Sequence, residues 1–528
     1  MKKRVAIIVD GITVKKQIYD YIISSKKSLN YEITHLIIQN NPNKNNLYKK
    51  LITFVSHRGF FRLINHILFN FLIKFESIIV KTLFKIDAFQ SIDLSDLKLE
   101  RIETFPIISK NSLFYSFSDK DINKIREFKF DFIIREGKGI LKGEILNVTK
   151  SGIISFHHGD NDYFRGGPPG FWEVFYKKKQ TGFIVQKLND QLDGGDVLYK
   201  GFISTKPFYL LNLFKLYEKS YPIMNIILEK LSLNKNELKF FKKKPYFNKL
   251  YTIPSVYVQF LYLFDVIKYI SKKFFYKIFN KKYRWHVAYQ FSESWKNIVL
   301  YKSKIIQNPK NRFLADPFVW EKNGEHFIFL EDYNFKQSKA KISVYKINKN
   351  KAIELGTALE ENFHLSYPFL FSYNNELFMC PETLETNDIR IYKCLNFPLK
   401  WKLENILIKN IRAVDTNIFF KNKKWWLITN SNLKTNKDYQ DQMYLFSNDN
   451  PLSSDWKNNT LNPILFNSRQ TRNGGLIIDK DELYRVYQKN GFDFYGESLG
   501  ISKIIDINQK IFKEKKLFSI NANFYPNI

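Results

Sequence analysis

A strand–turn–strand unit recurs four times in the second half of the chain, and this repeat restricts the fold more than any other feature. The units begin 51, 48 and 59 residues apart, at Asp316, Tyr367, Asp415 and Gly474. Their central turns are Asn323-Gly324, Asn374-Asn375, Asn422-Lys423 and Lys480-Asp481. One such hairpin cannot bury its own faces, so neighbouring units must pack on each other, and a period near 50 residues is typical of β-propeller blades.

Two further segments are expected to close this repeat into a ring. The stretch RWHVAYQF begins at Arg284, and LGISKIIDI begins at Leu499. We expect them to pair as a fifth blade, because a propeller is closed by joining early and late strands. The sequence therefore predicts an all-β five-bladed propeller over residues 283–528.

The first half of the chain shows a different pattern. Short β-branched runs at 5–10, 32–38, 130–141 and 151–158 alternate with helical stretches, as in a parallel sheet with crossover helices. We therefore expect an α/β domain over 1–205 and a helical connector over 206–282. The apolar stretches at 47–90 and 255–279 have helical spacing with basic residues between. The first is expected to pack on the sheet or a partner subunit, and the second to belong to the connector, with membrane-surface contact as the alternative for both.

Composition excludes several classes of protein. The formal charge is +32, but the lysines are dispersed without an arginine-rich block, which argues against nucleic acid as the partner. Two cysteines, Cys380 and Cys394, cannot make a four-cysteine zinc site, and no metal is expected. The first apolar run ends at Asp10, too early for a signal peptide, and no segment is long enough to span a bilayer. A cytoplasmic enzyme is expected.

The segment ISFHHGDNDYFRGGPPG at 154–170 concentrates chemically versatile side chains where a strand ends. Ser155 and His157 share one face of the strand, because successive residues point to opposite faces, and His158 should point away. A glycine- and proline-containing loop with Arg165 follows, and LDGG at 192–195 comes after the next strand. Taken alone, a histidine such as His157 is more often a hydrogen-bonded structural residue, and an acid such as Asp193 more often holds a turn.

This segment resembles the formyltransferase family, which includes methionyl-tRNA formyltransferase, glycinamide ribonucleotide formyltransferase and the sugar N-formyltransferases. Over about 130–201 the chain follows the family's order of Asn-x-His, a loop ending in Arg-Gly, Thr-Gly, and Leu-Asp-x-Gly. The resemblance implies a Rossmann-like formyltransferase domain that uses 10-formyltetrahydrofolate as co-substrate. It implies His157 and Asp193 as catalytic residues, and Gly139, Arg165, Gly166, Gly194 and Gly195 beside the folate.

The family transfers a formyl group to an amine through a tetrahedral intermediate with a negative oxygen. A donating imidazole stabilises such an oxygen, and a carboxylate tunes the imidazole and helps to move the amine proton. Ser155 replaces the family's asparagine, so a shorter hydroxyl takes the place of the second oxyanion donor. We expect Ser155 to serve as that donor; the alternative is a degenerate domain that binds without catalysis.

The repeat region resembles glycosidase-like five-bladed domains and, more closely, the domain attached to plant glucosamine inositolphosphorylceramide transferases. The matching strings over about 285–500 include ADPF, HLSYPFLF, VDTNIF and TRNGG. The resemblance implies a central funnel with a candidate sugar site, formed by Asp316, Glu331, Glu382, Asp415 and Arg472. Paired carboxylates suit glycoside chemistry, and acids can also hold turns or bind a sugar without cutting it. We expect carbohydrate binding rather than hydrolysis, because spacing alone assigns no acid–base pair.

Together these features predict formyl transfer to an amino sugar, either nucleotide-linked or part of a glycan, with the propeller binding carbohydrate. One alternative is a glycan-cleaving or glycan-transferring propeller with a degenerate formyltransferase domain. The other is a non-catalytic glycan-binding protein, which the serine at 155 favours.

Overall fold

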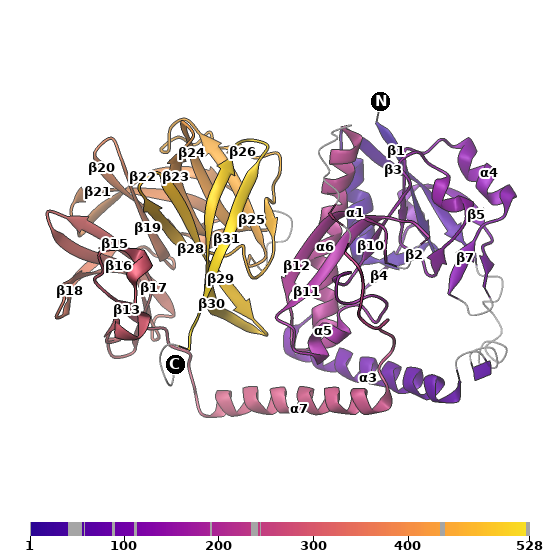
Figure 1. Cartoon of the computed structure of the whole chain (residues 1–528), viewed down its shortest axis with the longest axis horizontal. Helices are drawn as coiled ribbons and strands as arrows, with labels where there is room; N and C mark the ends of the chain where they lie inside the picture. Colours follow the sequence, from indigo (N-terminus) through magenta and orange to yellow (C-terminus); the bar gives the residue numbers. More distant parts are fainter. Residues whose placement is uncertain are drawn as a thin grey trace. The chain divides into compact units, whose positions relative to one another are not determined.

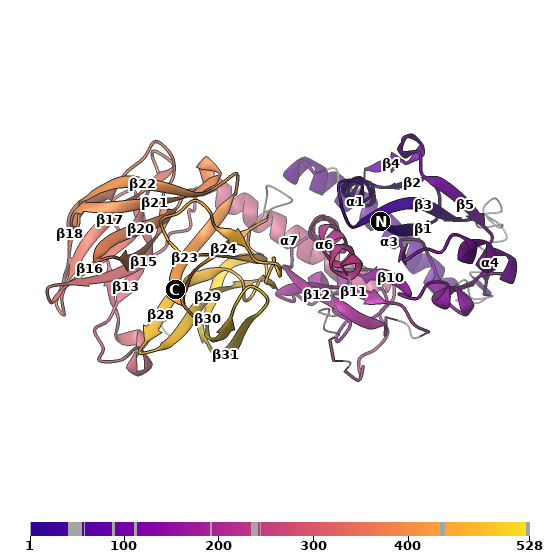
Figure 2. The same ribbon diagram turned by 90° about the horizontal axis from the view of Figure 1, so that it is seen from above.

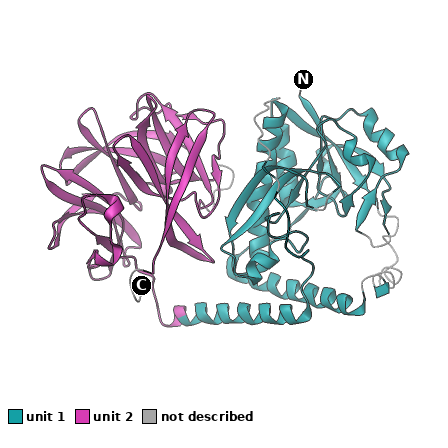
Figure 3. Cartoon of the chain, viewed as in Figure 1, with its two compact units in different colours: residues 1–275 teal, residues 276–528 magenta. Residues whose placement is uncertain are grey.

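The computed structural model describes residues 2–40, 55–56, 59–86, 90–109, 113–190, 193–233, 241–242, 244–432 and 439–523. The chain divides into two compact units, Met1–Phe275 and Tyr276–Ile528 (Figure 3). Residues 206–282, expected as a separate connector, instead contribute a buried helix and most of a second helix to unit 1. The predicted helical stretch at 47–90 lies partly outside the described residues.

Unit 1 is built on an open seven-stranded sheet with the order β12-β11-β10-β8-β1-β3-β5 (Figure 1). Five of these strands are parallel, and β11 and β12 continue the sheet antiparallel. The sheet strands are β1 (Lys3–Val9), β3 (Tyr31–Gln39), β5 (Glu100–Thr104), β8 (Phe132–Arg135), β10 (Ile153–His157), β11 (Gln180–Lys187) and β12 (Asp196–Ser204). The predicted α/β class is therefore confirmed.

Short strands and helices complete unit 1. The short strands are β2 (Thr13–Lys15), β4 (Ser91–Asp93), β6 (Ile107–Ile108), β7 (Phe114–Ser116) and β9 (Ile140–Leu141). The helices are α1 (Lys16–Lys26), α3 (Phe60–Phe84), α4 (Asp119–Glu127), α5 (Phe171–Phe175), α6 (Tyr209–Ser232) and α7 (Val256–Ile278). No helix of the described residues is both long and apolar enough to cross a bilayer.

The core of unit 1 follows from the β-branched strands. Ile8, Ile37, Ile133 and Ile153 come from four adjacent parallel strands and are almost fully buried on one face of the sheet. Such strands, covered on both faces, are typical of parallel sheets. Helix α6 covers part of the other face, and most of its first four turns are buried.

The described residues of unit 2 form five antiparallel sheets of consecutive strands. Their members are β13 (Val287–Tyr289) and β14 (Lys304–Ile306); β15 (Arg312–Lys322), β16 (Glu325–Asn334), β17 (Lys339–Ile347) and β18 (Ala352–Leu359); β19 (Ser366–Tyr373), β20 (Glu376–Glu382), β21 (Asp388–Asn396) and β22 (Lys400–Lys409); β23 (Ala413–Lys421), β24 (Lys424–Ser431), β25 (Gln442–Asn448), β26 (Lys457–Asn458) and β27 (Leu465–Phe466); and β28 (Asn473–Asp479), β29 (Glu482–Gly491), β30 (Phe494–Ile507) and β31 (Phe512–Asn521). The four hairpins predicted from the repeat are all confirmed.

The predicted fifth blade is wrong in its pairing. Strand β13 pairs with β14, which follows it in the chain, and residues 499–507 lie in β30 between β29 and β31. The short segment around Trp295, between β13 and β14, contacts the last sheet: the Trp295 indole donates to Asp479 at 3.2 Å and packs on Tyr484. The first and last sheets are therefore joined by side chains and not by a shared ladder.

Candidate functional site

His157 and Asp193 meet at the end of strand β10, although 36 residues separate them. The His157 Nδ1 atom lies 3.3 Å from the Asp193 Oδ1 atom. The other ring nitrogen, Nε2, lies 2.9 Å from the carbonyl oxygen of Phe164. Asp193 has a left-handed backbone with φ of 50°, which is rare outside glycine and common at functional sites. Its Oδ2 atom accepts a hydrogen bond from Gly166 N at 3.0 Å.

Both ring nitrogens of His157 face acceptors, so the imidazolium form satisfies both contacts. Burial lowers the pKa of His157, but the charge and hydrogen bond of Asp193 and the Phe164 carbonyl outweigh it and raise the pKa above its usual 6.5. Burial raises the pKa of Asp193, but the contacts with His157 and Gly166 outweigh this and lower it below 3.8. The two contacts therefore favour the ion pair, in which an N–H donor is directed at a carbonyl oxygen.

Ser155 and His158, on opposite faces at the end of β10, both have partners within unit 1. The Ser155 hydroxyl donates to the carbonyl oxygen of Arg135 on β8 at 3.2 Å and is buried. In this rotamer the hydroxyl hydrogen stabilises the sheet and is not directed at a bound molecule. His158 points to the opposite face, as its place on the strand predicts, where its Nε2 lies 3.1 Å from Ser220 of α6 and its ring packs on Tyr217.

The loop after β10 is fixed to a distant segment. Gly167 N donates to the Tyr251 carbonyl at 3.0 Å, and Tyr251 N donates to the Arg165 carbonyl at 2.9 Å. Gly166 has φ of 95°, and a Cβ there would overlap the Tyr251 carbonyl oxygen. The Arg165 guanidinium donates to Asn161 O and stacks 4.5 Å from the ring centre of Tyr246.

The remaining glycines assigned to folate binding are in close backbone packing. A Cβ on Gly139, where φ is 80°, would overlap the ring of Tyr115. A Cβ on Gly195 would overlap the carbonyl oxygen of Lys187, and Gly195 N donates to the Gln186 side chain at 3.1 Å. The Gly194 carbonyl accepts from Asn189 at 3.1 Å. Gly139 and Gly195 thus allow close packing within unit 1.

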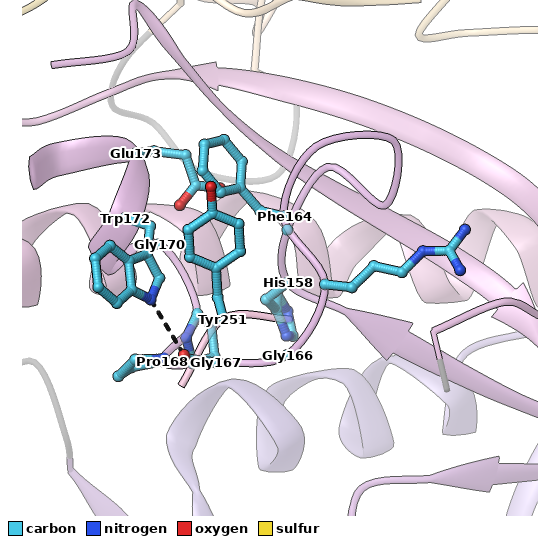
Figure 4. A pocket seen from close by; sticks show the side chains of 12 residues that line it. His158, Phe164, Gly166, Gly167, Pro168, Gly170, Trp172, Glu173 and Tyr251 are labelled. Atoms are coloured by element: carbon cyan, nitrogen blue, oxygen red, sulfur yellow. Dashed lines mark hydrogen bonds between the residues drawn. The ribbon is translucent and has the colours of Figure 1, made fainter. Parts of the chain in front are cut away.

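A small pocket lined by His158, and not by His157, contains a residue that the sequence argument missed (Figure 4). Its free volume, about 10 Å³, is that of about one water molecule. Glu173 of α5 lines it and is 2 % exposed, and its Oε1 atom has no hydrogen-bond partner. Burial raises the pKa of Glu173 to about 7. In the sequence, Glu173 lies between Trp172 and Val174, and this position in an apolar stretch was the only signal.

Three polar side chains at the carboxyl ends of β3 and β8 were also missed. The Nε and Nη1 atoms of Arg135, Oε1 of Glu136 and Oε1 of Gln39 are buried without partners. Burial lowers the pKa of Arg135 to about 10 and raises that of Glu136 to about 7. The crevice at the carboxyl ends of such strands is where open α/β sheets bind ligands. The charged pair in the string IIREG was the available signal.

The five candidate residues of unit 2 converge. Asp316 and Asp415 occupy equivalent β-bulges in the first strands of two sheets, with φ of 45° and 50°. Glu331 pairs with the residue just before the Asp316 bulge, and Glu382 pairs with Ser366, just before the corresponding bulge of the sheet between them. Arg472, just before β28, donates to both carboxylate oxygens of Asp415, and its Nη2 lies 4.0 Å from Glu382 Oε2. Bulges commonly redirect side chains next to active sites.

Burial dominates the electrostatics of this carboxylate cluster, defined as Asp316, Glu331, Glu382 and Asp415. It raises the pKa of Asp316 to about 7 and that of Glu382 to about 8, assisted by Asp415 in both cases and opposed by Arg472. Burial and the neighbouring acids raise the pKa of Glu331 well above 4.5. Arg472 balances one of four carboxyl groups, so at neutral pH the cluster holds protonated acids that can donate hydrogen bonds.

Comparison with known proteins separates the two halves of the chain. The family model described as Glucosamine inositolphosphorylceramide transferase 1, N-terminal, matches residues 285–523. Glucosamine inositolphosphorylceramide transferase 1 of Arabidopsis thaliana is 35% identical over 221 residues, which are 41% of this chain and 28% of that protein. The chain thus spans little more than a quarter of the length of this relative.

The first half is similar to formyltransferases. Methionyl-tRNA formyltransferase of Buchnera aphidicola subsp. Acyrthosiphon pisum is 24% identical over 284 residues, which are 51% of this chain and 86% of that protein. A crystal structure of phosphoribosylglycinamide formyltransferase from Bacillus halodurans shares 17% identity over 46% of this chain and 100% of that one, with a TM-score of 0.30. By sequence, the chain is thus similar to methionyl-tRNA formyltransferase in its first half and to the glucosamine inositolphosphorylceramide transferase 1 N-terminal family in its second.

Proposed function

We propose that unit 1 transfers a formyl group from 10-formyltetrahydrofolate to a primary amine. The observation that carries this proposal is the His157–Asp193 pair, with its Nε2–H directed at a carbonyl oxygen. The sequence similarity to methionyl-tRNA formyltransferase supports the same chemistry. The Phe164 carbonyl contacts Nε2 where we expect a formyl oxygen to bind, so this loop carbonyl must yield its contact during the reaction.

The chain's residues have distinct parts in this reaction. The bound folate supplies the formyl group: the amine nitrogen bonds to the formyl carbon, and the bond from that carbon to the folate nitrogen breaks. His157 donates from Nε2 to the formyl oxygen while it carries negative charge. Asp193 keeps the imidazole protonated and oriented. Glu173, with a pKa near neutrality, accepts the proton that the amine loses, and the folate nitrogen finally takes up one proton.

We further propose that unit 2 is a five-bladed propeller with β13–β14 as a reduced blade. Each sheet shares a hydrophobic core with the next one along the chain. These pairs are β13–β14 with β15–β18, β15–β18 with β19–β22, β19–β22 with β23–β27, and β23–β27 with β28–β31. The contact of Trp295 with Asp479 joins the last sheet to the first. In such a ring the bulges of the first strands face the centre, where the carboxylate cluster and Arg472 are expected to bind carbohydrate.

This site suggests an amino sugar as the acceptor, nucleotide-linked or within a glycan. Protonated acids and an arginine give both donors and acceptors for sugar hydroxyls. The convergence of four carboxyl groups also favours a second candidate function, in which unit 2 acts on glycosidic bonds. An acid–base pair for that chemistry requires one protonated and one ionised carboxyl group, and the raised pKa of Glu382 beside the Arg472-bound Asp415 matches this.

The test is formylation by the purified full-length protein. Incubation with 10-formyltetrahydrofolate and a panel of amino sugars should release tetrahydrofolate and form a formamide detectable by mass spectrometry. His157→Ala should lower kcat/KM by about 10²–10⁴-fold, because it removes a group that acts in proton transfer and oxyanion stabilisation. Glu173→Gln should lower kcat more than it raises KM. Lys120→Ala, an exposed change on α4, is the matched control.

Turnover on simple amines but not on amino sugars would refute the amino sugar as the acceptor and would still support formyl transfer. No turnover on any amine, with the folate analogue still bound, would refute the reaction. Sugar release that survives His157→Ala and disappears in Asp316→Asn would establish the second candidate function instead.

A further inference from the structure

Helices α3 and α7 pack through one face each on the same aromatic residues of unit 1. Phe69 of α3 contacts Phe171 and Tyr209, with ring centres 5.5 and 5.7 Å apart. Tyr262 of α7 contacts Phe171 at 5.2 Å, and its hydroxyl accepts from Tyr209 N at 2.8 Å. The Tyr262 hydroxyl also donates to Glu76 of α3 at 2.7 Å. The two helices thus lie on one side of unit 1, below the sheet in Figure 1 and behind it in Figure 2.

The opposite face of α3 is apolar and exposed. Its residues recur at helical spacing: Phe60, Ile67, Phe71, Phe75 and Ile78. Phe71 is 63% exposed. Soluble proteins rarely leave such a continuous apolar stripe in water, and where it occurs it marks a binding surface.

Helix α7 has a matching stripe. Its members are Tyr257, Phe260, Phe264, Ile267 and Phe275, again spaced by three, four or multiples thereof, and Phe264 is 60% exposed. Both stripes lie opposite faces that pack on the same aromatic residues, so they are exposed on the same side of unit 1. We call these two stripes together the aromatic face.

The charges beside the aromatic face have one sign. Helices α3 and α7 contain seven lysines and arginines and two acids. Both acids have partners elsewhere: Glu76 is buried and accepts from Tyr262, and Asp265 pairs with Lys177 at 3.0 Å. Lys74 and Lys268 are exposed and flank the apolar stripes of their helices. Long basic side chains beside an apolar stripe are typical of helices that lie in a membrane interface.

Charge decides between a membrane and a second copy of the chain as the occupant. A symmetric dimer places the same patch on both sides of the contact, which would bring these basic residues together. An anionic lipid surface attracts them, because its negative potential favours each Lys or Arg near the surface. Neither helix is suited to span the bilayer.

We propose that the aromatic face binds the surface of an anionic lipid bilayer, with α3 and α7 lying parallel to it. The aromatic and aliphatic side chains enter the boundary between headgroups and acyl chains, and the lysines contact the phosphates. This places unit 1 at a membrane surface, independently of the reaction proposed above.

The test is co-sedimentation of the full-length protein with vesicles. Vesicles of phosphatidylcholine with 30% phosphatidylglycerol should bind the protein at least tenfold more tightly than phosphatidylcholine alone, and 0.5 M salt should weaken binding by screening. The double variant Phe71→Asp/Phe264→Asp should lose at least tenfold in binding. The matched control is Phe420→Asp/Ile478→Asp, which changes two similarly exposed apolar residues of unit 2 and should bind as the unaltered protein does.

A second measurement keeps the proposal testable if the double variant does not fold. An environment-sensitive dye on Phe264→Cys, in a Cys394→Ser background, should shift to the blue on addition of the anionic vesicles. Equal binding to both vesicle types, equal losses in the two double variants, or an unchanged dye would overturn the proposal. A dimer in solution that Phe71→Asp/Phe264→Asp splits would show instead that a second copy covers this face.

Discussion

Arg472 donates to both carboxylate oxygens of Asp415, reaching it from the loop before the neighbouring sheet. The two residues lie 57 positions apart; Asp415 is almost fully buried, and the Arg472 side chain is 13% exposed. Arg472 also lies over the ring of Tyr495 at 5.1 Å. The pair therefore links two sheets at the place where the carboxylate cluster gathers, and its loss should affect both the stability and the ligand binding of unit 2.

Arg472→Met should destabilise unit 2 by about 3–5 kcal/mol, because it leaves the buried Asp415 carboxylate without its cation. Denaturant unfolding of the full-length protein, followed by tryptophan fluorescence, measures this loss. Adding Asp415→Asn should recover at least half of it. Lys424→Met, which breaks an exposed pair with Asp449, should cost less than about 1 kcal/mol. Similar losses in both single variants would contradict this assignment.

The stability of unit 2 should fall as pH rises from about 4.5 to 8. The folded state keeps protons on Asp316 and Glu382 after the unfolded chain has lost them, because their pKa values are raised to about 7 and about 8. Unfolding therefore releases protons, which favours it as pH rises. Calorimetry across this range should show a smaller decrease in Tm for Glu382→Gln. A Tm that rises over the same range would rule out the protonated cluster.

The pKa of His157 should lie above 6.5 in the unaltered protein and below 6.5 in Asp193→Asn, where burial is no longer outweighed. Titration of the imidazole signals by NMR gives both values. In the linked stability, the contribution of His157 is complete below pH 6.5 and is lost as pH rises through its folded pKa. The contribution of Asp193 to stability is present above pH 3.8 and is lost as pH falls through the lowered pKa of Asp193 in the folded state. An unchanged pKa of His157 in Asp193→Asn would show that Asp193 does not raise it.

Ser155→Ala should lower stability by about 1 kcal/mol and kcat/KM by less than tenfold. The structure gives the hydroxyl a partner in the Arg135 carbonyl, so its removal costs one buried hydrogen bond. If Ser155 were the second oxyanion donor, the loss in kcat/KM would be about 10²–10³-fold. Thermal melting and steady-state kinetics on the same preparations distinguish these outcomes, with Ser155→Thr as the variant that retains a hydroxyl.

Local signals predicted much of this fold. The Asn323-Gly324 and Asn374-Asn375 turns identify hairpins because tight turns with positive φ select Asn and Gly. Asn422-Lys423 and Lys480-Asp481 follow this rule only in part or not at all, and were identified by their place in the repeat. The β-branched runs at β1, β3, β8 and β10 identify buried parallel strands, because strands covered on both faces are nearly continuous apolar runs. The meeting of His157 with Asp193 came from a family pattern, since no spacing rule brings residues 36 positions apart into contact.

Non-local features were predicted less well. The partner of β13 depends on which sheet edge is nearest in space, and the sequence patterns of β14 and of 499–507 are equally compatible with pairing. The role of α6 was missed because an amphipathic helix covering a sheet and one connecting domains share the same period. Glu173 and Arg135 violate the rule that charged residues avoid the core, and only the fold reveals that they do.

The repeated bulge has a consequence for how unit 2 can diversify. At equivalent places in three sheets, the left-handed position is held by Asp316, Tyr367 and Asp415. The kink in the ladder persists whether the residue there is acidic or aromatic. A duplicated module of this kind can exchange one interior group at a time while its hairpins stay intact, so new ligand preferences are accessible through single codon changes.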